Sequence, residues 1–353
     1  MNHGNALRVL RAVGVLELVL LCGAPPAIAA QPAPVAAAPA AASQLLDRKL
    51  ASDLVPGPVE FYVLLPPGYN AGGERYPLVL NLHGGRGSRA ALERQRPLFD
   101  ELWSAGRIAP MVIVTPSVTP RCFYMDSRDG SERWETFLLG PFLDHLRANW
   151  HLRTDPRGTF LTGISMGGMG ALRMAFKYPE RFGAVAGMEP GIEPILEWKE
   201  MRPKHRFWRS DELMGEAYGS PIDEAYWAAN NPPAIAIANA DSIRSSGLRI
   251  LIEAGDQDMF WLHEGTRFLH DVLWNQRIRH QFHLYLGEDH VGRSLAWRTA
   301  AAFEFLARTL EEPQPDPAIE AARRRIDPLK QALEEADHYG LDADKIRGPR
   351  PTP

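Results

Sequence analysis

The feature that most limits how this chain can fold is an alternation of short apolar runs with longer helical segments between residues 51 and 311. Seven runs have the length and the β-branched or aromatic content of strands. Several are apolar almost throughout, as in strands that helices cover on both faces. The runs are VEFYVLLPP (59–67), YPLVLNLHG (76–84), APMVIVTP (109–116), GTFLTGIS (158–165), FGAVAGM (182–188), LRILIEAG (248–255) and HQFHLYLG (280–287).

The segments between these runs have the spacing of amphipathic helices. They are RPLFDELWSAG (96–106), ERWETFLLGPFLDHLRANW (132–150), GMGALRMAFKY (168–178), LHEGTRFLHDVLWNQ (262–276) and LAWRTAAAFEFLARTL (295–310). This order predicts an α/β fold with a mostly parallel central sheet and helices on both faces. Reactive groups in such sheets collect at the carboxyl ends of the strands. The residues that follow each strand are therefore the candidates for chemistry.

Both ends of the chain differ in composition from the predicted domain at 51–311. Residues 1–30 carry Arg8 and Arg11, then an apolar run, then AIAA, as in a secretory signal peptide. An alanine- and proline-rich linker is expected over 31–50 and a charged extension over 312–353. We therefore expect an exported protein, periplasmic or secreted, with no stable membrane span after signal cleavage.

Two other interpretations of the first 30 residues stay open. The apolar run could be an uncleaved anchor, although it is short for a membrane span. Cys22 could carry a lipid, but Leu21 precedes it where a lipoprotein signal needs a small residue, so this is not favoured. Signal removal would leave Cys122 as the only cysteine, which excludes an internal disulfide. Cys122 also lacks the helix-start context of a reactive thiol.

The net charge of −4 provides no basic field, so we expect no nucleic-acid partner. The histidines and carboxylates show no zinc-ligand spacing, and we expect no metal and no organic cofactor. Oligomeric state is not readable from the sequence.

The stretch TFLTGISMGGMGALRM (159–174) places Ser165 between a predicted strand and a predicted helix. Its G-x-S-x-G pattern is that of a nucleophile elbow, where glycines let strand and helix approach closely. The pentapeptide alone is only suggestive, since glycine and serine are common residues. A structural turn serine is the alternative, and the strand–turn–helix context favours a nucleophile.

A serine nucleophile needs a base, and a histidine base needs a carboxylate to orient it. His290 follows the last predicted strand and precedes the last helix, whereas the predicted helices and strands of this region contain His263, His270, His280 and His283. Asp258 follows the strand at 248–255 and is favoured as the acid. Asp256, which could cap the turn, and Glu189 in GMEPG remain alternatives.

The tetrahedral oxyanion needs two hydrogen-bond donors. One candidate is the backbone N–H of Met166, directly after Ser165 at a helix N-terminus. The loop LVLNLHGGRGS supplies the other, and we assign it to Gly85 because glycine lets the backbone approach a substrate.

These motifs together resemble the putative-esterase family of α/β-hydrolases, which includes esterase D, feruloyl and acetylxylan esterases, enterochelin esterase and the mycolyltransferase antigens. The resemblance covers about residues 58–310. It implies an α/β-hydrolase fold with Ser165 as nucleophile, Asp258 as acid and His290 as base, and with oxyanion donors at Gly85 and Met166. The implied substrate is a small-molecule or carbohydrate-linked carboxylic ester, cleaved through an acyl-enzyme.

The sequence departs from the family in two places. AGMEPGIEP stands where many members have a serine-rich turn, and the segment from 192 to 242 does not align, although it should wall the pocket. Tyr124, Trp208 and Trp261 are candidate aromatic walls, with core positions as the alternative. An acyltransferase with the same triad, a non-catalytic carbohydrate-binding homologue and a peptidase remain alternative functions.

Overall fold

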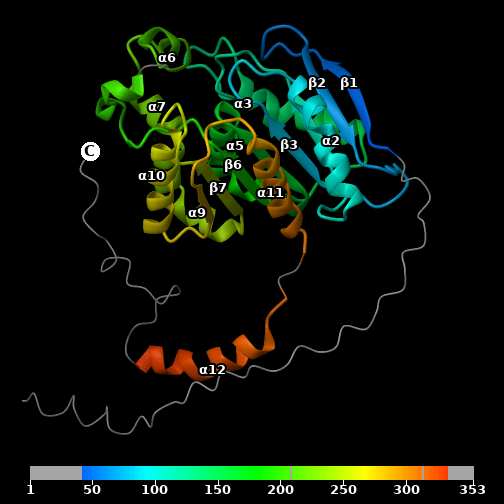
Figure 1. Cartoon of the computed structure of the whole chain (residues 1–353). Coiled ribbons are helices and arrows are strands. Elements are labelled where there is room, and N and C mark those ends of the chain that lie inside the picture. The colour runs from blue at the N-terminus through cyan, green and yellow to red at the C-terminus, as the bar shows by residue number, and fades with distance from the viewer. Residues whose placement is uncertain (1–41, 207–208, 312–313, 333–353) are drawn as a thin grey trace, which may run out of the picture. The chain divides into compact units, whose positions relative to one another are not determined.

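The computed structural model describes residues 42–206, 209–311 and 314–332, and side-chain burial is assigned up to residue 329. Its centre is an eight-stranded sheet in the order β1-β2-β4-β3-β5-β6-β7-β8 (Figure 1). β1 and β2 pair antiparallel, as do β2 and β4, and all other neighbours are parallel. The strands are β1 (Gln44–Leu50), β2 (Val59–Leu65), β3 (Leu78–Leu82), β4 (Val112–Pro116), β5 (Thr159–Ile164), β6 (Ala184–Met188), β7 (Arg249–Gly255) and β8 (Gln281–Tyr285).

All seven strands expected from the sequence are present, and the mostly parallel sheet confirms the predicted fold class. The longer helices are α2 (Ala90–Ser104), α5 (Met166–Lys177), α10 (Leu262–Asn275), α11 (Leu295–Arg308) and α12 (Pro317–Ala332). The helix expected over 132–150 is interrupted by a π-helical turn that contains Pro141, which cannot donate a backbone hydrogen bond. Its parts are α3 (Trp134–Phe137), η1 (Leu138–Phe142) and α4 (Leu143–Asn149).

Strand β1 was not expected, because the linker was predicted to extend over residues 31–50. Residues 44–50 instead pair with the whole of β2, with Gln44 opposite Leu65 and Leu50 opposite Val59. The segment QLLDRKL is half exposed and carries three consecutive charged residues, which suits an edge strand and weakens its apolar signal. Its neighbours stabilise it through charge, since Lys49 pairs with Glu60 at 2.7 Å.

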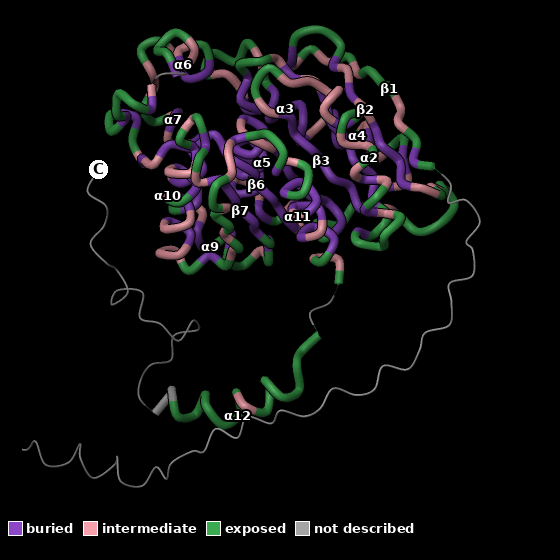
Figure 2. Tube along the Cα trace, viewed as in Figure 1, coloured by how far each residue is buried: buried purple, intermediate pink, exposed green. Residues whose placement is uncertain are grey.

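Each face of the sheet has its own apolar core, because alternate side chains of each strand point to opposite faces. Leu78 and Leu80 of β3 belong to the larger core, which includes residues of α5 and α10. Val79 belongs to the smaller core, which is closed by α2 and α11. Figure 2 shows this arrangement as buried strands between helices with exposed outer surfaces.

The segment at 192–242 that could not be aligned folds into short helices on the side of the larger core. It packs tightly on α10, since a Cβ added at Gly265 would lie 1.8 Å from the carbonyl oxygen of Ile192. Trp198 and Trp227 are buried with their rings 5.9 Å apart, so both are core residues. The elements are η4 (Trp198–Glu200), η5 (Pro203–Arg206), α6 (Asp211–Tyr218), α7 (Glu224–Asn230), α8 (Pro232–Ala238) and α9 (Ala240–Ser246).

The predicted signal peptide and Cys22 lie outside the described residues, as do residues 333–353 of the extension. Within the part of the chain that the structure describes, no helix has the length and apolar character needed to cross a bilayer.

Candidate active site

Ser165 occupies a strained turn between β5 and α5. Its backbone has φ 57° and ψ −118°, which is a rare conformation for a residue with a side chain. The turn is tight enough to require glycine on both sides. A Cβ at Gly163 would lie 2.6 Å from the backbone of Gly167, and one at Gly167 would lie 2.2 Å from the carbonyl oxygen of Leu82. This is the geometry of a nucleophile elbow.

The loop after β3 lies beside this elbow. A Cβ added at Gly84 would stand 3.5 Å from the Cβ of Ser165, whereas one at Gly85 would meet nothing within 4 Å. Gly85 is exposed, so a substrate can reach its backbone. Met166 is the first residue of α5, and its N–H therefore has no acceptor inside the helix. The two amides assigned to the oxyanion hole remain predictions that this geometry permits.

His83 anchors the loop after β3 through hydrogen bonds at both of its ring nitrogens. Its Nδ1 lies 2.8 Å from the carbonyl oxygen of Gly84, and its Nε2 accepts a hydrogen bond from the N–H of Val118 at 3.3 Å. Burial lowers the pKa of His83, which keeps the ring neutral and able to accept that bond. Tyr124 adds a third contact by donating its hydroxyl to the His83 carbonyl at 2.9 Å.

Asp258 and His290 form a buried pair at the ends of β7 and β8. His290 Nδ1 lies 2.7 Å from Asp258 Oδ2, and both residues are buried. The other oxygen, Oδ1, accepts the backbone N–H groups of Phe260 at 2.7 Å and Leu262 at 3.3 Å. Burial would raise the pKa of Asp258, but the hydrogen bonds from His290 and Glu189 outweigh it and hold the pKa below its ordinary value. The carboxylate is therefore ionised and fixed on both oxygens.

The two alternative acids have other positions. Asp256 follows β7, and its Oδ1 accepts the N–H of Gly287 in the turn after β8 at 2.6 Å. Glu189 is fully buried near Asp258. The His290 ring is hydrogen-bonded to the carboxylate of Asp258 and not to that of Glu189. Among the described residues, only the Asp258 carboxylate is hydrogen-bonded to the His290 ring.

The Ser165 hydroxyl makes no hydrogen bond to His290 among the described residues. Both lie at the carboxyl edge of the sheet, where β5, β6, β7 and β8 are neighbours. Hydrogen bonds between nucleophile and base are often long without substrate and shorten in the complex.

A cluster of buried charges that the sequence did not predict lies behind the Asp258–His290 pair. Arg298 of α11 is 1% exposed, and its Nη1 pairs with Glu189 and with Glu253 Oε2, the latter at 3.1 Å. Its Nη2 donates to the carbonyl oxygens of Asp289 at 2.9 Å and His290 at 3.3 Å. The guanidinium thus connects the ends of β6 and β7 to the loop that carries His290. An arginine near the start of the alanine- and phenylalanine-rich run at 295–310 is the sequence signal that was missed.

The three aromatic residues predicted to line the pocket differ in where the structure places them. Tyr124 is fully buried, and a Cβ at Gly170 would lie 2.6 Å from it, so it packs beneath the site and lines no open pocket. Its designation as a wall was wrong because its hydroxyl is used inside the protein. Trp208 lies outside the described residues. Trp261 is 42% exposed and its backbone N–H donates to the carbonyl of Asp258 at 2.9 Å, and its role as a wall remains a prediction.

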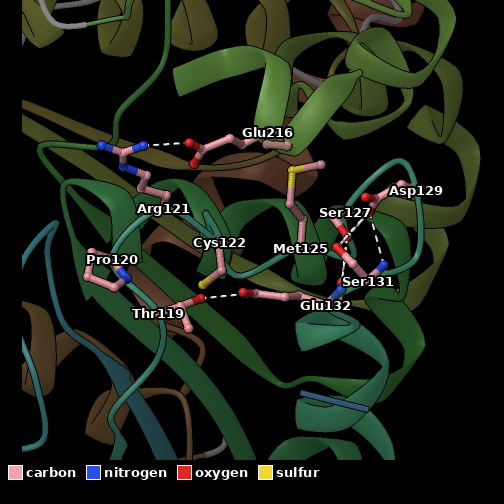
Figure 3. A pocket seen from close by; sticks show the side chains of 11 residues that line it. Thr119, Pro120, Arg121, Cys122, Met125, Ser127, Asp129, Ser131, Glu132 and Glu216 are labelled. Atoms are coloured by element: carbon pink, nitrogen blue, oxygen red, sulfur yellow. Dashed lines mark hydrogen bonds and ion pairs between the residues drawn. The ribbon is translucent and has the colours of Figure 1, made fainter. Parts of the chain in front are cut away.

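A cavity of about 410 Å³ lies between the loop after β4 and helix α6 (Figure 3). Polar groups across it are paired with one another, as Arg121 with Glu216 at 2.5 Å and Thr119 with Glu132 at 2.6 Å. Ser165, Asp258 and His290 do not line it. Cys122 does, but burial raises the pKa of its thiol to about 12, which is incompatible with a nucleophilic thiolate.

Comparisons with known proteins agree with this architecture. The family model described as "Putative esterase" matches residues 52–306. Esterase Rv1288 of Mycobacterium tuberculosis is 27% identical over 243 residues, which are 63% of this chain and 50% of that protein. The diacylglycerol acyltransferase/mycolyltransferase Ag85A of Mycobacterium bovis is 24% identical over 243 residues, or 64% of this chain and 67% of that protein. The chain thus spans about half the length of the first of these relatives.

Solved structures share the fold. A ferulic acid esterase superposes with a TM-score of 0.63 at 19% identity, covering 76% of this chain and 99% of that one. The S-formylglutathione hydrolase of Staphylococcus aureus superposes with a TM-score of 0.60 at 15% identity, covering 75% and 99%. The elbow at Ser165, the parallel sheet and the family match agree, and the chain belongs to the putative-esterase family of α/β-hydrolases.

Proposed function

We propose that this protein is a serine esterase that cleaves carboxylic esters through an acyl-enzyme. The observation that carries the proposal is the left-handed Ser165 at the β5–α5 elbow on the same sheet edge as the 2.7 Å Asp258–His290 pair. A strained serine is maintained only where the surrounding structure holds it, and such strain gathers at functional sites. Membership of the esterase family and the esterase names among its relatives support the same reaction.

The proposed reaction starts when the Ser165 Oγ attacks the ester carbonyl and His290 Nε2 takes its proton. Asp258 keeps the other proton on Nδ1 and stabilises the imidazolium that forms. The amides of Met166 and Gly85 donate to the developing oxyanion, each worth about 3 kcal/mol of transition-state stabilisation. His290 then protonates the leaving alcohol and activates the water that hydrolyses the acyl-enzyme.

The direct test is covalent labelling of the purified protein with a fluorophosphonate, read by peptide mass spectrometry. We expect one adduct, on Ser165, and none in Ser165→Ala. The same variant should lose ester hydrolysis by about 10⁶-fold in kcat, as expected when a triad nucleophile is removed. Correctly folded wild-type protein that carries no label and hydrolyses no ester would contradict the proposal and favour a non-catalytic carbohydrate-binding role.

The substrate is proposed to be a small-molecule or carbohydrate-linked ester. Structural neighbours are named for ferulic acid and for S-formylglutathione, which differ greatly in acyl size. A panel of acetyl, formyl, feruloyl and longer acyl esters separates these classes by kcat/KM. A matched anilide tests the peptidase alternative, for which hydrolysis would be comparable to that of the ester.

Acyl transfer is the second candidate, since the same triad can pass the acyl group to an alcohol. The mycolyltransferase name of one relative is the observation that favours it. Product analysis with and without an alcohol or sugar as acceptor distinguishes the reactions. A hydrolase releases free acid in both cases, whereas a transferase forms the new ester at the expense of the acid.

Export is part of the proposal and rests on the signal-like residues 1–30. The full chain expressed in a bacterial host should lose these residues and appear in the periplasm or medium. N-terminal peptide mapping of each fraction checks this, and an intact N-terminus in the cytoplasm would contradict it.

A further inference from the structure

Glu189, the residue directly after β6, sits at the centre of the buried charges behind the Asp258–His290 pair. It is fully buried and has φ 41°, a strained conformation for a residue with a side chain. Its N–H donates to the carbonyl of Glu253 at 2.9 Å. Its Oε1 accepts the N–H of Gly255 at 2.7 Å and also pairs with Arg298.

The second oxygen of Glu189 has no such donor. Oε2 is buried and accepts no hydrogen bond from an N–H or hydroxyl group of the described residues. The Asp258 carboxylate is close by, since oxygens of Glu189 and Asp258 and a ring nitrogen of His290 all lie within 4.8 Å of one another. Two adjacent buried carboxyl groups cannot both stay ionised unless a cation lies between them.

The other titratable groups of this cluster come from β7, from the turn after it, from α11 and from the side of β8. β7 contributes Glu253, the turn after it Asp258, and α11 Arg298, with His290 and Tyr285 on the side of β8. The cluster thus holds three carboxyl groups and one guanidinium, which pairs with Glu189 and Glu253. Arg298 Nη1 already serves Glu189 Oε1 and Glu253 Oε2, which leaves the contact between Glu189 and Asp258 without a cation.

A proton between these two carboxyl groups belongs on Glu189. Burial, the hydrogen bond with Asp258 and the charge of Glu253 raise the pKa of Glu189 to about 9. The pKa of Asp258 is lowered despite its burial, because His290 and Glu189 both donate to it. Asp258 is thus the anion and Glu189 the neutral acid at neutral pH.

We propose that Glu189 is a positioning residue that donates a carboxylic-acid hydrogen bond to Asp258 and so holds the carboxylate that orients His290. This inference rests on the proposed function, because it assigns Asp258 and His290 to the triad. A protonated acid offers Asp258 a donor without adding a second negative charge beside it. Arg298 anchors the opposite oxygen of Glu189 and fixes the direction of the donor.

The proposal has a pH signature. When Glu189 loses its proton, Asp258 loses a donor and gains a repelling neighbour, so activity should fall on the alkaline side. Glu189→Gln keeps an N–H donor toward Asp258 and an oxygen for Gly255 and Arg298 at every pH. Glu189→Leu keeps the volume but has no donor.

The test measures the second-order rate constant for fluorophosphonate labelling of Ser165 and kcat/KM for a soluble aryl acetate, from pH 6 to 10.5. Ser165→Ala supplies the background hydrolysis at each pH. We expect the wild-type rates to fall about tenfold per pH unit above the alkaline midpoint. Glu189→Gln should stay within about threefold of wild type at pH 7.5 and lack this fall. Glu189→Leu should be at least about tenfold slower at every pH.

Glu253→Gln is the matched control, since it removes a carboxylate of the same cluster that is not hydrogen-bonded to Asp258. The Glu253 charge raises the pKa of Glu189, so this variant should keep the alkaline fall but shift its midpoint to lower pH. Circular dichroism and thermal unfolding check that each variant is folded. If Glu189→Leu does not fold, the comparison of wild type with Glu189→Gln still decides the question.

Three results would overturn the inference: an alkaline fall in Glu189→Gln equal to that of wild type, no fall in wild type up to pH 10.5, or wild-type rates in folded Glu189→Leu. Loss of activity on chelation with recovery on added zinc would also overturn it, because a metal ion would then occupy the cluster in place of the proton. Failure of the proposed function has a different result, which is the absence of any Ser165 adduct in the wild-type protein.

Discussion

The two halves of the candidate active site depend on different physical interactions. The nucleophile side uses backbone geometry, with Gly163, Ser165 and Gly167 in a turn that admits no further atoms. The acid–base side uses buried charge, with Asp258 and His290 supported by a cluster centred on Arg298. The first side depends on steric fit and should be insensitive to pH. The second depends on which groups carry protons, so its behaviour should change with pH.

The largest expected effect on the acid–base side comes from Asp258→Asn. The amide keeps the shape but favours the wrong imidazole tautomer, and we expect kcat for ester hydrolysis to fall about 10⁴-fold. Asp256→Asn is the matched control two residues away, and it should change kcat by less than about threefold because its carboxylate caps a turn. Steady-state kinetics on both purified variants check this, and equal losses would mean that the acid is wrongly assigned.

The next prediction tests whether the buried charge cluster stabilises the loop that carries His290. Arg298→Met removes the guanidinium from two carboxyl groups and two carbonyls, and we expect unfolding free energy to drop by about 3–5 kcal/mol. Urea denaturation followed by fluorescence measures it. The exposed Arg308→Met in the same helix should cost less than about 1 kcal/mol, as a cation near a helix C-terminus. Similar losses of unfolding free energy in both variants would show that any positive charge on α11 contributes to stability, and that the buried cluster has no special role.

On the nucleophile side the corresponding test is Gly167→Ala. The added methyl would lie 2.2 Å from the carbonyl oxygen of Leu82, and backbone atoms cannot move aside as a flexible side chain can. We expect a loss of about 3 kcal/mol in unfolding free energy, at the upper end for overpacking. The loss should be equal at pH 6 and pH 8, because no titrating group is involved.

Gly140→Ala is the control for this substitution. A Cβ at Gly140 meets nothing within 4 Å and its φ is not left-handed, so alanine there should be neutral or slightly stabilising. A Gly167→Ala variant as stable as Gly140→Ala would show that the elbow can relax, and would contradict a purely steric account of this side.

The sequence predicted the two halves unequally, for the same physical reason that separates them. The elbow is local: a strand, a serine between glycines and a helix are contiguous, so the pattern at 159–174 contains its whole geometry. The order of strands and helices predicted the sheet in the same way. Asp258 and His290 were found because each follows a predicted strand.

The buried cluster is not local and could not be found in that way. Glu189, Glu253 and Arg298 come from three elements, and their contact depends on strand register, which places Met188 opposite Glu253. Strand β1 was missed because a charged edge strand has a weak apolar pattern. Tyr124 was misassigned because an aromatic residue near the site has the same sequence signal whether it lines a pocket or packs beneath one.

The smallest expected effect concerns stability as a function of pH and separates the halves most directly. Glu189 binds its proton far more tightly in the folded protein, with a pKa of about 9, than in an unfolded chain, where it has an ordinary glutamate value. Between these two values the folded state holds one more proton than the unfolded state, so each rise in pH favours unfolding. That contribution is at most about 1.4 kcal/mol per pH unit for a single group.

Glu189→Gln removes it, so the wild type should lose stability relative to this variant as the pH rises from 6.5 to 7.5. Gly167→Ala should shift the wild-type curve down without changing its slope. Urea unfolding of the three proteins at both pH values measures this. If Glu189→Gln has the wild-type slope, Glu189 is already ionised in the folded protein and the acid–base side does not hold the proton assigned to it.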